Sequence, residues 1–315
     1  MNFIQTGFRG ENNWWMYVFS TLMVLIAINI GTIPLFIVAF VKAKGNVVKF
    51  IEAAENTFMT MGMNSNLFLF LMILGSVFGL LGLYLCVKLI HKKKFKWIVT
   101  SRRTIDWKRV FTAFFIWFLL CLILIGVGIY LEPELYTWNF KPIPFFILLG
   151  ISLVFFPFQT SLEELIFRGY LMQAFGQLAK NKWFPLLFTS VVFGLLHVGN
   201  PEIEKIGYIA LVFYIGTGLL FGIITLMDEG TEISLGLHAA NNIMGAVFVT
   251  ADWAVFQTDA LFVDTSEPSV NWEMFFPVFV IYPLILLLFS KIYGWSNWSE
   301  KLFGKVEKPF VIEES

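Results

Sequence analysis

The stretch Ser161-Leu-Glu-Glu-Leu-Ile-Phe-Arg-Gly-Tyr170 places three charged side chains directly after the apolar run 144–158. That run predicts a membrane-spanning helix. Each ionisable group at membrane depth costs about 2.5–3.5 kcal/mol on insertion scales, so three together indicate a functional site. In a helix, Glu164 and Arg168 lie four residues apart on one face, whereas Glu163 points about 100° away. We therefore expect the arginine to pair with Glu164 and Glu163 to face a cavity.

The composition predicts an all-α, polytopic membrane protein. Of the 315 residues, 58% are hydrophobic and 14% are charged, and the mean hydropathy of +0.76 is far above that of soluble domains. The apolar runs predict a bundle of about eight transmembrane helices, at 14–41, 67–90, 110–130, 144–160, 184–197, 206–227, 233–249 and 275–289. No repeat or linker divides them, so we expect residues 1–315 to form a single integral membrane domain.

Charge asymmetry between the loops predicts the orientation. The loop 91–109 carries eight Lys or Arg against Asp106 alone, whereas 251–273 carries five acids and no Lys or Arg. By the positive-inside rule the first loop is cytoplasmic, and 251–273 lies outside together with 131–142. Both termini are then cytoplasmic, and in a prokaryote the membrane would be the plasma membrane. His91, at the head of the basic loop, is expected to be solvated.

Charge and cysteine content exclude several classes of partner. The formal net charge is zero and the positive charges gather in short loops, so nucleic acid is not an expected partner. Cys86 and Cys121 both lie in apolar runs, which favours neither a disulfide framework nor a thiolate metal site. Membrane lipid is an expected partner, and the sequence carries no signal of oligomeric state.

Two further groups place polar side chains in apolar runs. His197 ends the fifth run, and His238-Ala-Ala-Asn-Asn242 begins a few residues into the seventh. Helical spacing puts Phe193 on the face of His197, and Asn242 on the face of His238. Taken singly, such residues are explained most simply as helix-to-helix hydrogen bonds, and the acid–arginine pair as a structural ion pair. Together, a carboxylate, two imidazoles and an amide can activate water and stabilise an oxyanion.

The ordered motifs Glu163-Glu164-x-x-x-Arg168, Phe193-x-x-x-His197 and His238-x-x-x-Asn242 resemble those of the CPBP family. This family comprises the CAAX proteases and bacteriocin-processing enzymes, is also called the Abi family, and includes the type II CAAX prenyl endopeptidase. The resemblance covers about 144–250, which would be the catalytic core.

The resemblance implies an intramembrane endopeptidase acting on a membrane-associated or lipid-modified peptide. Glu163 with His197 would activate water for attack on a peptide carbonyl. His238 with Asn242 would bind the resulting oxyanion. The supporting residues would be Glu164, Arg168 and Phe193.

The sequence favours a glutamate-based mechanism without a cofactor. The family is often labelled metalloprotease, and a Zn²⁺ site made of Glu163, His197 and His238 is the alternative. However, the chain lacks His-Glu-x-x-His, and Asn242 would be a poor zinc ligand.

Spacing also predicts the depth of the site. A turn at 181–182 would form a helical hairpin that brings Glu163 and His197 level, although the fifth helix would then be too short to cross the membrane. His238 follows Glu232 by six residues, which indicates a site in the inner half of the membrane, open to the cytoplasm.

Two other functions fit the same polar residues. A proton-coupled transporter could relay protons through them, although no inverted repeat is evident. A non-catalytic bacteriocin-immunity or scaffold protein is a role that the family name also covers.

Overall fold

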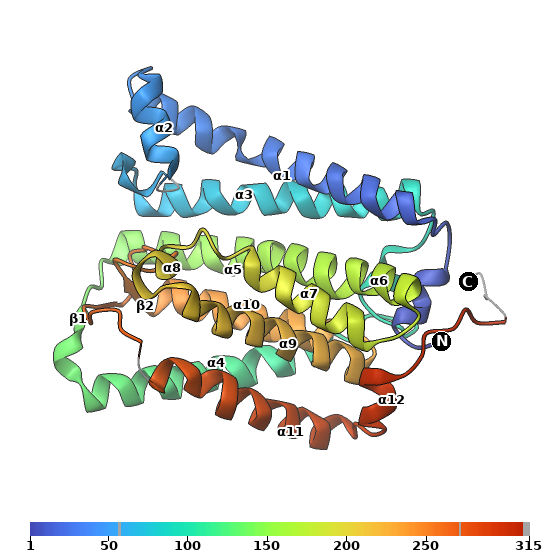
Figure 1. The fold of residues 1–315 in the computed structure, drawn as a ribbon. Helices are drawn as coiled ribbons and strands as arrows, with labels where there is room; N and C mark the ends of the chain where they lie inside the picture. Colours follow the sequence, from blue (N-terminus) through green and yellow to red (C-terminus); the bar gives the residue numbers. More distant parts are fainter. Residues whose placement is uncertain (56–57, 271, 311–315) are drawn as a thin grey trace.

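A computed structural model describes residues 1–55, 58–270 and 272–310 (Figure 1). Helices dominate the fold, which confirms the all-α class. Among the described residues, five helices are long and apolar enough to cross a membrane. They are Trp14–Lys42 (α1), Ser65–Ile90 (α3, Ser65–Leu85, and a π-helical turn), Trp107–Leu131 (α4), Pro142–Ala179 (α5 to α6) and Tyr208–Asp228 (a 3-10 turn and α9, Leu211–Asp228).

The other three predicted spans correspond to shorter helices. These are α7 (Trp183–Leu195), α10 (Glu232–Val247) and α11 (Tyr282–Tyr293), of 13, 16 and 12 residues. A 30 Å hydrocarbon core needs about 20 helical residues, so the count of eight spans stays a prediction. The remaining short helices are α2 (Val47–Glu55), α8 (Pro201–Ile206) and α12 (Trp298–Phe303).

The fourth helix is longer than the sequence indicates. Its apolar run ends near Thr160, yet α5 (Pro142–Glu164) continues through a π-helical segment, Leu165–Leu171, into α6 (Met172–Ala179). The charged residues that end the apolar run do not end the helix, because they are buried and paired inside the bundle. Short π-helical segments inside α-helices are frequent at functional sites.

Close helix packing brings α7 against α9. At Gly218 of α9, an added Cβ would lie 2.8 Å from the carbonyl oxygen of Ser190 on α7, and at Gly194 it would lie 3.0 Å from the backbone nitrogen of Ile215. Only glycine permits this approach, as at many membrane helix pairs. The same bundle packs α3 against both α1 and α5, and α10 against both α4 and α5.

A small sheet joins the two loops that are predicted to lie outside. Strand β3 (Phe262–Asp264) pairs antiparallel with β1 (Tyr136–Trp138) and parallel with β2 (Val249–Ala251). Figure 1 places β1 and β2 at the end of the bundle opposite both chain termini. The two acidic loops therefore share one end, as the predicted orientation requires.

His91 is buried, so the expectation that it is solvated was wrong. Its side chain has no exposed surface, and its Nε2 and Nδ1 atoms lie 2.6 Å from Tyr170 Oη and 2.7 Å from the backbone oxygen of Glu11. Burial, and then the charge of Lys93, lower the pKa of His91 to about 4. The N-terminal turn Ile4–Phe8 packs on α6 and on the start of the basic loop, contacts that spacing alone does not predict.

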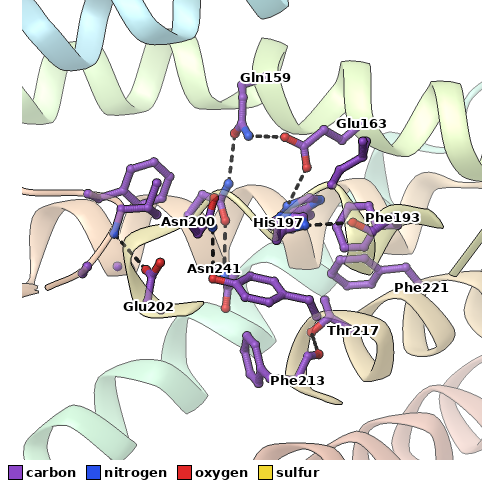
Figure 2. Close-up of a pocket in the computed structure, with 18 of the residues that line it drawn as sticks. Gln159, Glu163, Phe193, His197, Asn200, Glu202, Phe213, Thr217, Phe221 and Asn241 are labelled. Atoms are coloured by element: carbon purple, nitrogen blue, oxygen red, sulfur yellow. Dashed lines mark hydrogen bonds and ion pairs between the residues drawn. The ribbon is translucent and has the colours of Figure 1, made fainter. Parts of the chain in front are cut away.

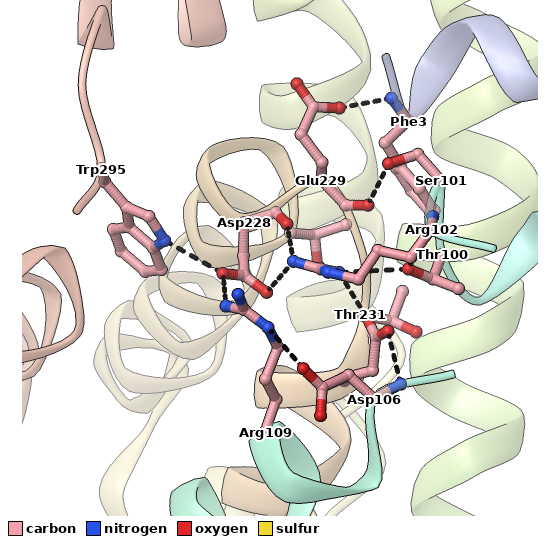
Figure 3. Close-up of polar contacts among 12 residues, drawn as sticks. Phe3, Thr100, Ser101, Arg102, Asp106, Arg109, Asp228, Glu229, Thr231 and Trp295 are labelled. Atoms are coloured by element: carbon pink, nitrogen blue, oxygen red, sulfur yellow. Dashed lines mark hydrogen bonds and ion pairs between the residues drawn. The ribbon is translucent and has the colours of Figure 1, made fainter. Parts of the chain in front are cut away.

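A buried ion-pair network ties the basic loop to α9 and α10 (Figure 3). Arg102 lies 2.8 Å from Asp228 and 3.1 Å from Glu232, whose side chains are 2% and 0% exposed. Arg109 joins the network by pairing with both Asp228 and Asp106. The network fixes the first turn of α10, the helix that carries His238 and Asn242.

We expect Arg102→Ala to destabilise the protein. Removing one partner of a buried pair leaves uncompensated charge and costs about 3–5 kcal/mol, so the melting temperature in detergent should fall by several degrees. Arg103→Ala is the matched control, because Arg103 is exposed and carries the same charge. Equal melting temperatures for the two variants would show that the network contributes nothing to stability.

Candidate active site

A cavity of about 590 Å³ opens within the bundle (Figure 2). Its walls come from α5, α7, α9 and α10, with contributions from α3, α4 and the segment around β2. The predicted residues that line it are Glu163, Phe193, His197, His238 and Asn242. The structure therefore brings side chains from three separate helical regions to one place.

The adjacent glutamates occupy different environments. Glu163 lines the cavity, whereas Glu164 is fully buried and lies 3.0 Å from Nη1 of Arg168, which is also fully buried. The ion pair expected from the i, i+4 spacing is thus present. Arg168 also donates a hydrogen bond of 3.2 Å to the carbonyl of Gly218, which ties this pair to α9.

His238 lies between the two glutamates. Its Nδ1 atom is 2.8 Å from Oε1 of Glu164, and its Nε2 atom is 3.7 Å from Oε2 of Glu163. A buried carboxylate on one ring nitrogen fixes the orientation of an imidazole and directs the other nitrogen at the site. The ring of Phe221 also packs against His238, at 5.2 Å between ring centroids.

His197 lies in the turn that follows α7. Its Nδ1 atom is 2.8 Å from the carbonyl oxygen of Phe193, so Nδ1 donates and Nε2 is left for the cavity. The His197 ring stacks on Tyr214 at 4.2 Å. Phe193 packs between His197 and Arg168: its ring lies 4.9 Å from the ring of His197 and 4.2 Å from the guanidinium of Arg168.

Gln159 links Glu163 to Asn242, a contact that the sequence analysis missed. Its side-chain nitrogen donates to Oε1 of Glu163, and its oxygen accepts a hydrogen bond of 2.9 Å from Nδ2 of Asn242. Figure 2 shows this chain of contacts along the upper wall of the cavity. The sequence does indicate this contact, because Gln159 precedes Glu163 by four residues and side chains with this spacing lie on one face of a helix. Asn241 adds a further amide, donating to Oδ1 of Asn242 at 3.2 Å.

The cavity extends toward the sheet end of the bundle. Its described lining includes Val249, Thr250, Ala251 and 253–256, together with Asp264 of β3, on the side predicted to lie outside. Which side of the membrane the site opens to stays a prediction. The six-residue spacing from Glu232 places His238 within α10 (Glu232–Val247).

Sequence comparison identifies the family. A family model described as "Type II CAAX prenyl endopeptidase Rce1-like" matches residues 142–244, which contain all three motifs. The uncharacterized protein YyaK of Bacillus subtilis (strain 168) is 30% identical over 306 residues, which cover 96% of this chain and 98% of that protein. The chain belongs to the CPBP family of CAAX proteases. No solved structure matches the chain.

The family region coincides with the elements that build the cavity. It begins at the first residues of α5 and ends within α10, so the family match and the polar cavity lie in the same part of the protein. The apolar helices and the family together make the chain an integral membrane protein of a protease family.

The proposed zinc ligands do not form a ready metal site. Across the described parts of the chain, no group of three His, Cys, Asp or Glu side chains is placed to hold a metal ion. One oxygen of Glu163 accepts from Gln159, and Nδ1 of His238 contacts Glu164. Independence of a metal ion stays a prediction.

We expect Gln159 to act as a positioning residue. Gln159→Ala would release both Glu163 and Asn242, and losing such a supporting contact typically costs 10–100-fold in activity. The value of kcat for peptide cleavage in proteoliposomes should fall by about that factor, with an unchanged melting temperature. Gln159→Glu should lower kcat further, because it places a like charge beside Glu163. Unchanged kcat in Gln159→Ala would contradict the assignment.

Proposed function

We propose that this protein is an intramembrane endopeptidase that hydrolyses a peptide bond in a membrane-associated or lipid-modified substrate. The observation that carries the proposal is the cavity in which Glu163, His197, His238 and Asn242 meet. An enclosed site of this kind excludes lipid and bulk water, which strengthens electrostatic interactions inside it.

Glu163 is the general base. Gln159 holds its Oε1 atom, so Oε2 is the oxygen that faces the cavity and takes a proton from water. The water oxygen then attacks the carbonyl carbon of the substrate. His197 contributes through Nε2, because Nδ1 is already committed to the carbonyl of Phe193.

His238 and Asn242 stabilise the oxyanion that this attack creates. His238 faces the oxyanion with Nε2, while its Nδ1 contacts Glu164. Asn242 also donates from Nδ2, which has two hydrogens: one is bonded to Gln159, and the other is directed to the oxyanion. Donors of this kind are worth about 10²–10³ in kcat. As the C–N bond breaks, Glu163 returns its proton to the leaving amine.

The buried pair of Glu164 and Arg168 positions this machinery. Glu164 contacts His238 at 2.8 Å and Arg168 at 3.0 Å, so Arg168 balances the charge of the carboxylate that orients His238. Neither residue lines the cavity, and both act on the reaction through His238.

Glu163→Gln and His197→Ala should abolish cleavage. Each removes a group that transfers protons, for which a loss of about 10²–10⁴-fold is typical. The measurement compares new peptide termini in a membrane proteome exposed to each variant in proteoliposomes. Glu134→Gln is the control, because this exposed glutamate lies outside the cavity and its loss removes the same charge.

Full cleavage by both variants, at normal membrane insertion, would end the protease proposal. Ion or solute flux that depends on Glu163, without any new termini, would favour transport instead.

Chelation should leave activity intact. In the proposed mechanism the carboxylate of Glu163 activates water, so purified enzyme treated with EDTA or 1,10-phenanthroline should cleave at the same rate as untreated enzyme. Elemental analysis provides the second measurement. Stoichiometric zinc, together with chelator-sensitive activity that zinc restores, would replace this mechanism with a metal-dependent one.

A further inference from the structure

The cavity carries charge of one sign. The described residues that line it include three carboxylates, Glu163, Glu202 and Asp264, and no Lys or Arg. Arg168 lies nearby, but it is fully buried and paired with Glu164. A cleft that is lined by one sign of charge and has low-dielectric walls concentrates groups of the opposite charge.

Glu202 lies beyond the proposed catalytic residues. It is in α8 and follows His197 by only five residues. Oε1 accepts a hydrogen bond of 2.8 Å from the backbone nitrogen of Val255. Oε2 is buried and has no hydrogen-bond partner in the described part of the chain. An unsatisfied buried carboxylate oxygen is costly, and a donor that arrives from outside the protein would satisfy it.

The space between Glu202 and His197 has polar and aromatic walls. Asn200 donates a hydrogen bond of 3.1 Å to the hydroxyl of Tyr214, and the ring of Tyr214 stacks on His197. Trp253 also lines this part of the cavity. Aromatic faces attract ammonium and guanidinium groups, and in Figure 2 Glu202 lies across the cavity from Glu163.

We infer that Glu202 forms a subsite for a lysine or arginine side chain of the substrate. This inference rests on the proposed function and names the substrate class of the same site. Five residues of chain span at most about 18 Å, and an extended peptide advances about 3.3 Å per residue. The basic residue therefore lies within about five residues of the scissile bond.

Binding tests the subsite independently of cleavage. The probes are acetylated and amidated apolar peptides that are identical except for one central residue, which is lysine, norleucine or glutamate. They are titrated against the Glu163→Gln protein in nanodiscs, so no turnover occurs. The lysine peptide should bind about tenfold more tightly than the norleucine peptide, and the glutamate peptide more weakly than either.

Glu202→Gln, made on the Glu163→Gln background, should remove the lysine preference and leave the affinity for the norleucine peptide unchanged. Glu134→Gln on the same background should keep the preference, because Glu134 is exposed and outside the cavity. Equal or unmeasurable binding of the lysine and norleucine peptides would overturn the inference, and so would a preference that survives Glu202→Gln.

Two further measurements separate the remaining outcomes. A norleucine peptide with a free N-terminus that gains affinity through Glu202, without any gain from lysine, would assign the subsite to a terminal ammonium group and overturn the side-chain assignment. Cleavage is measured with the unmutated protein. A Glu202-dependent lysine preference without any cleavage would refute the protease proposal and leave the subsite standing.

Discussion

The site depends on one fully buried carboxylate that serves two partners. Oε1 of Glu164 contacts the guanidinium of Arg168 and the imidazole of His238. A buried glutamate without these partners would be strongly destabilising. Since Arg168 also binds the backbone of α9, this single group connects the helices that carry the proposed base, the proposed oxyanion donors and the aromatic wall. The geometry of the cavity follows from satisfying that charge.

Two adjacent residues of the same type thus have opposite tasks. Glu164 turns into the protein and is neutralised there, whereas Glu163 is left beside the cavity, where it accepts from the amide of Gln159 and lies 3.7 Å from Nε2 of His238. The distinction arises from the 100° step between successive helical residues. One turn of one helix can thus place a carboxylate, Glu163, beside the cavity and bury the next one, Glu164, against Arg168.

Much of this site could be predicted from the sequence, because it depends on local geometry. The pairing of Glu164 with Arg168 follows from helical spacing. The shared location of Glu163, His197 and His238 in one cavity was expected because all three are polar residues within or beside apolar runs. What could not be predicted depends on contacts between distant segments. His91 is buried because Glu11 and Tyr170 contact its ring, and the fourth helix outlasts its apolar run because Glu164 and Arg168 are paired. The loop residues around β2 and β3 that line the cavity could not be predicted either, because helical periodicity says nothing about where loops lie.

The π-helical segment Leu165–Leu171 changes how the long helix must be interpreted along its length. Hydrogen bonds from i to i+5 make this turn wider than its neighbours, so the angular register of α5 is not carried over into α6. A helical wheel drawn continuously from Pro142 to Ala179 would misassign the faces of the second half. The two halves therefore present different surfaces. The cavity contacts α5 through Gln159 and Glu163, whereas α6 packs against the N-terminal turn.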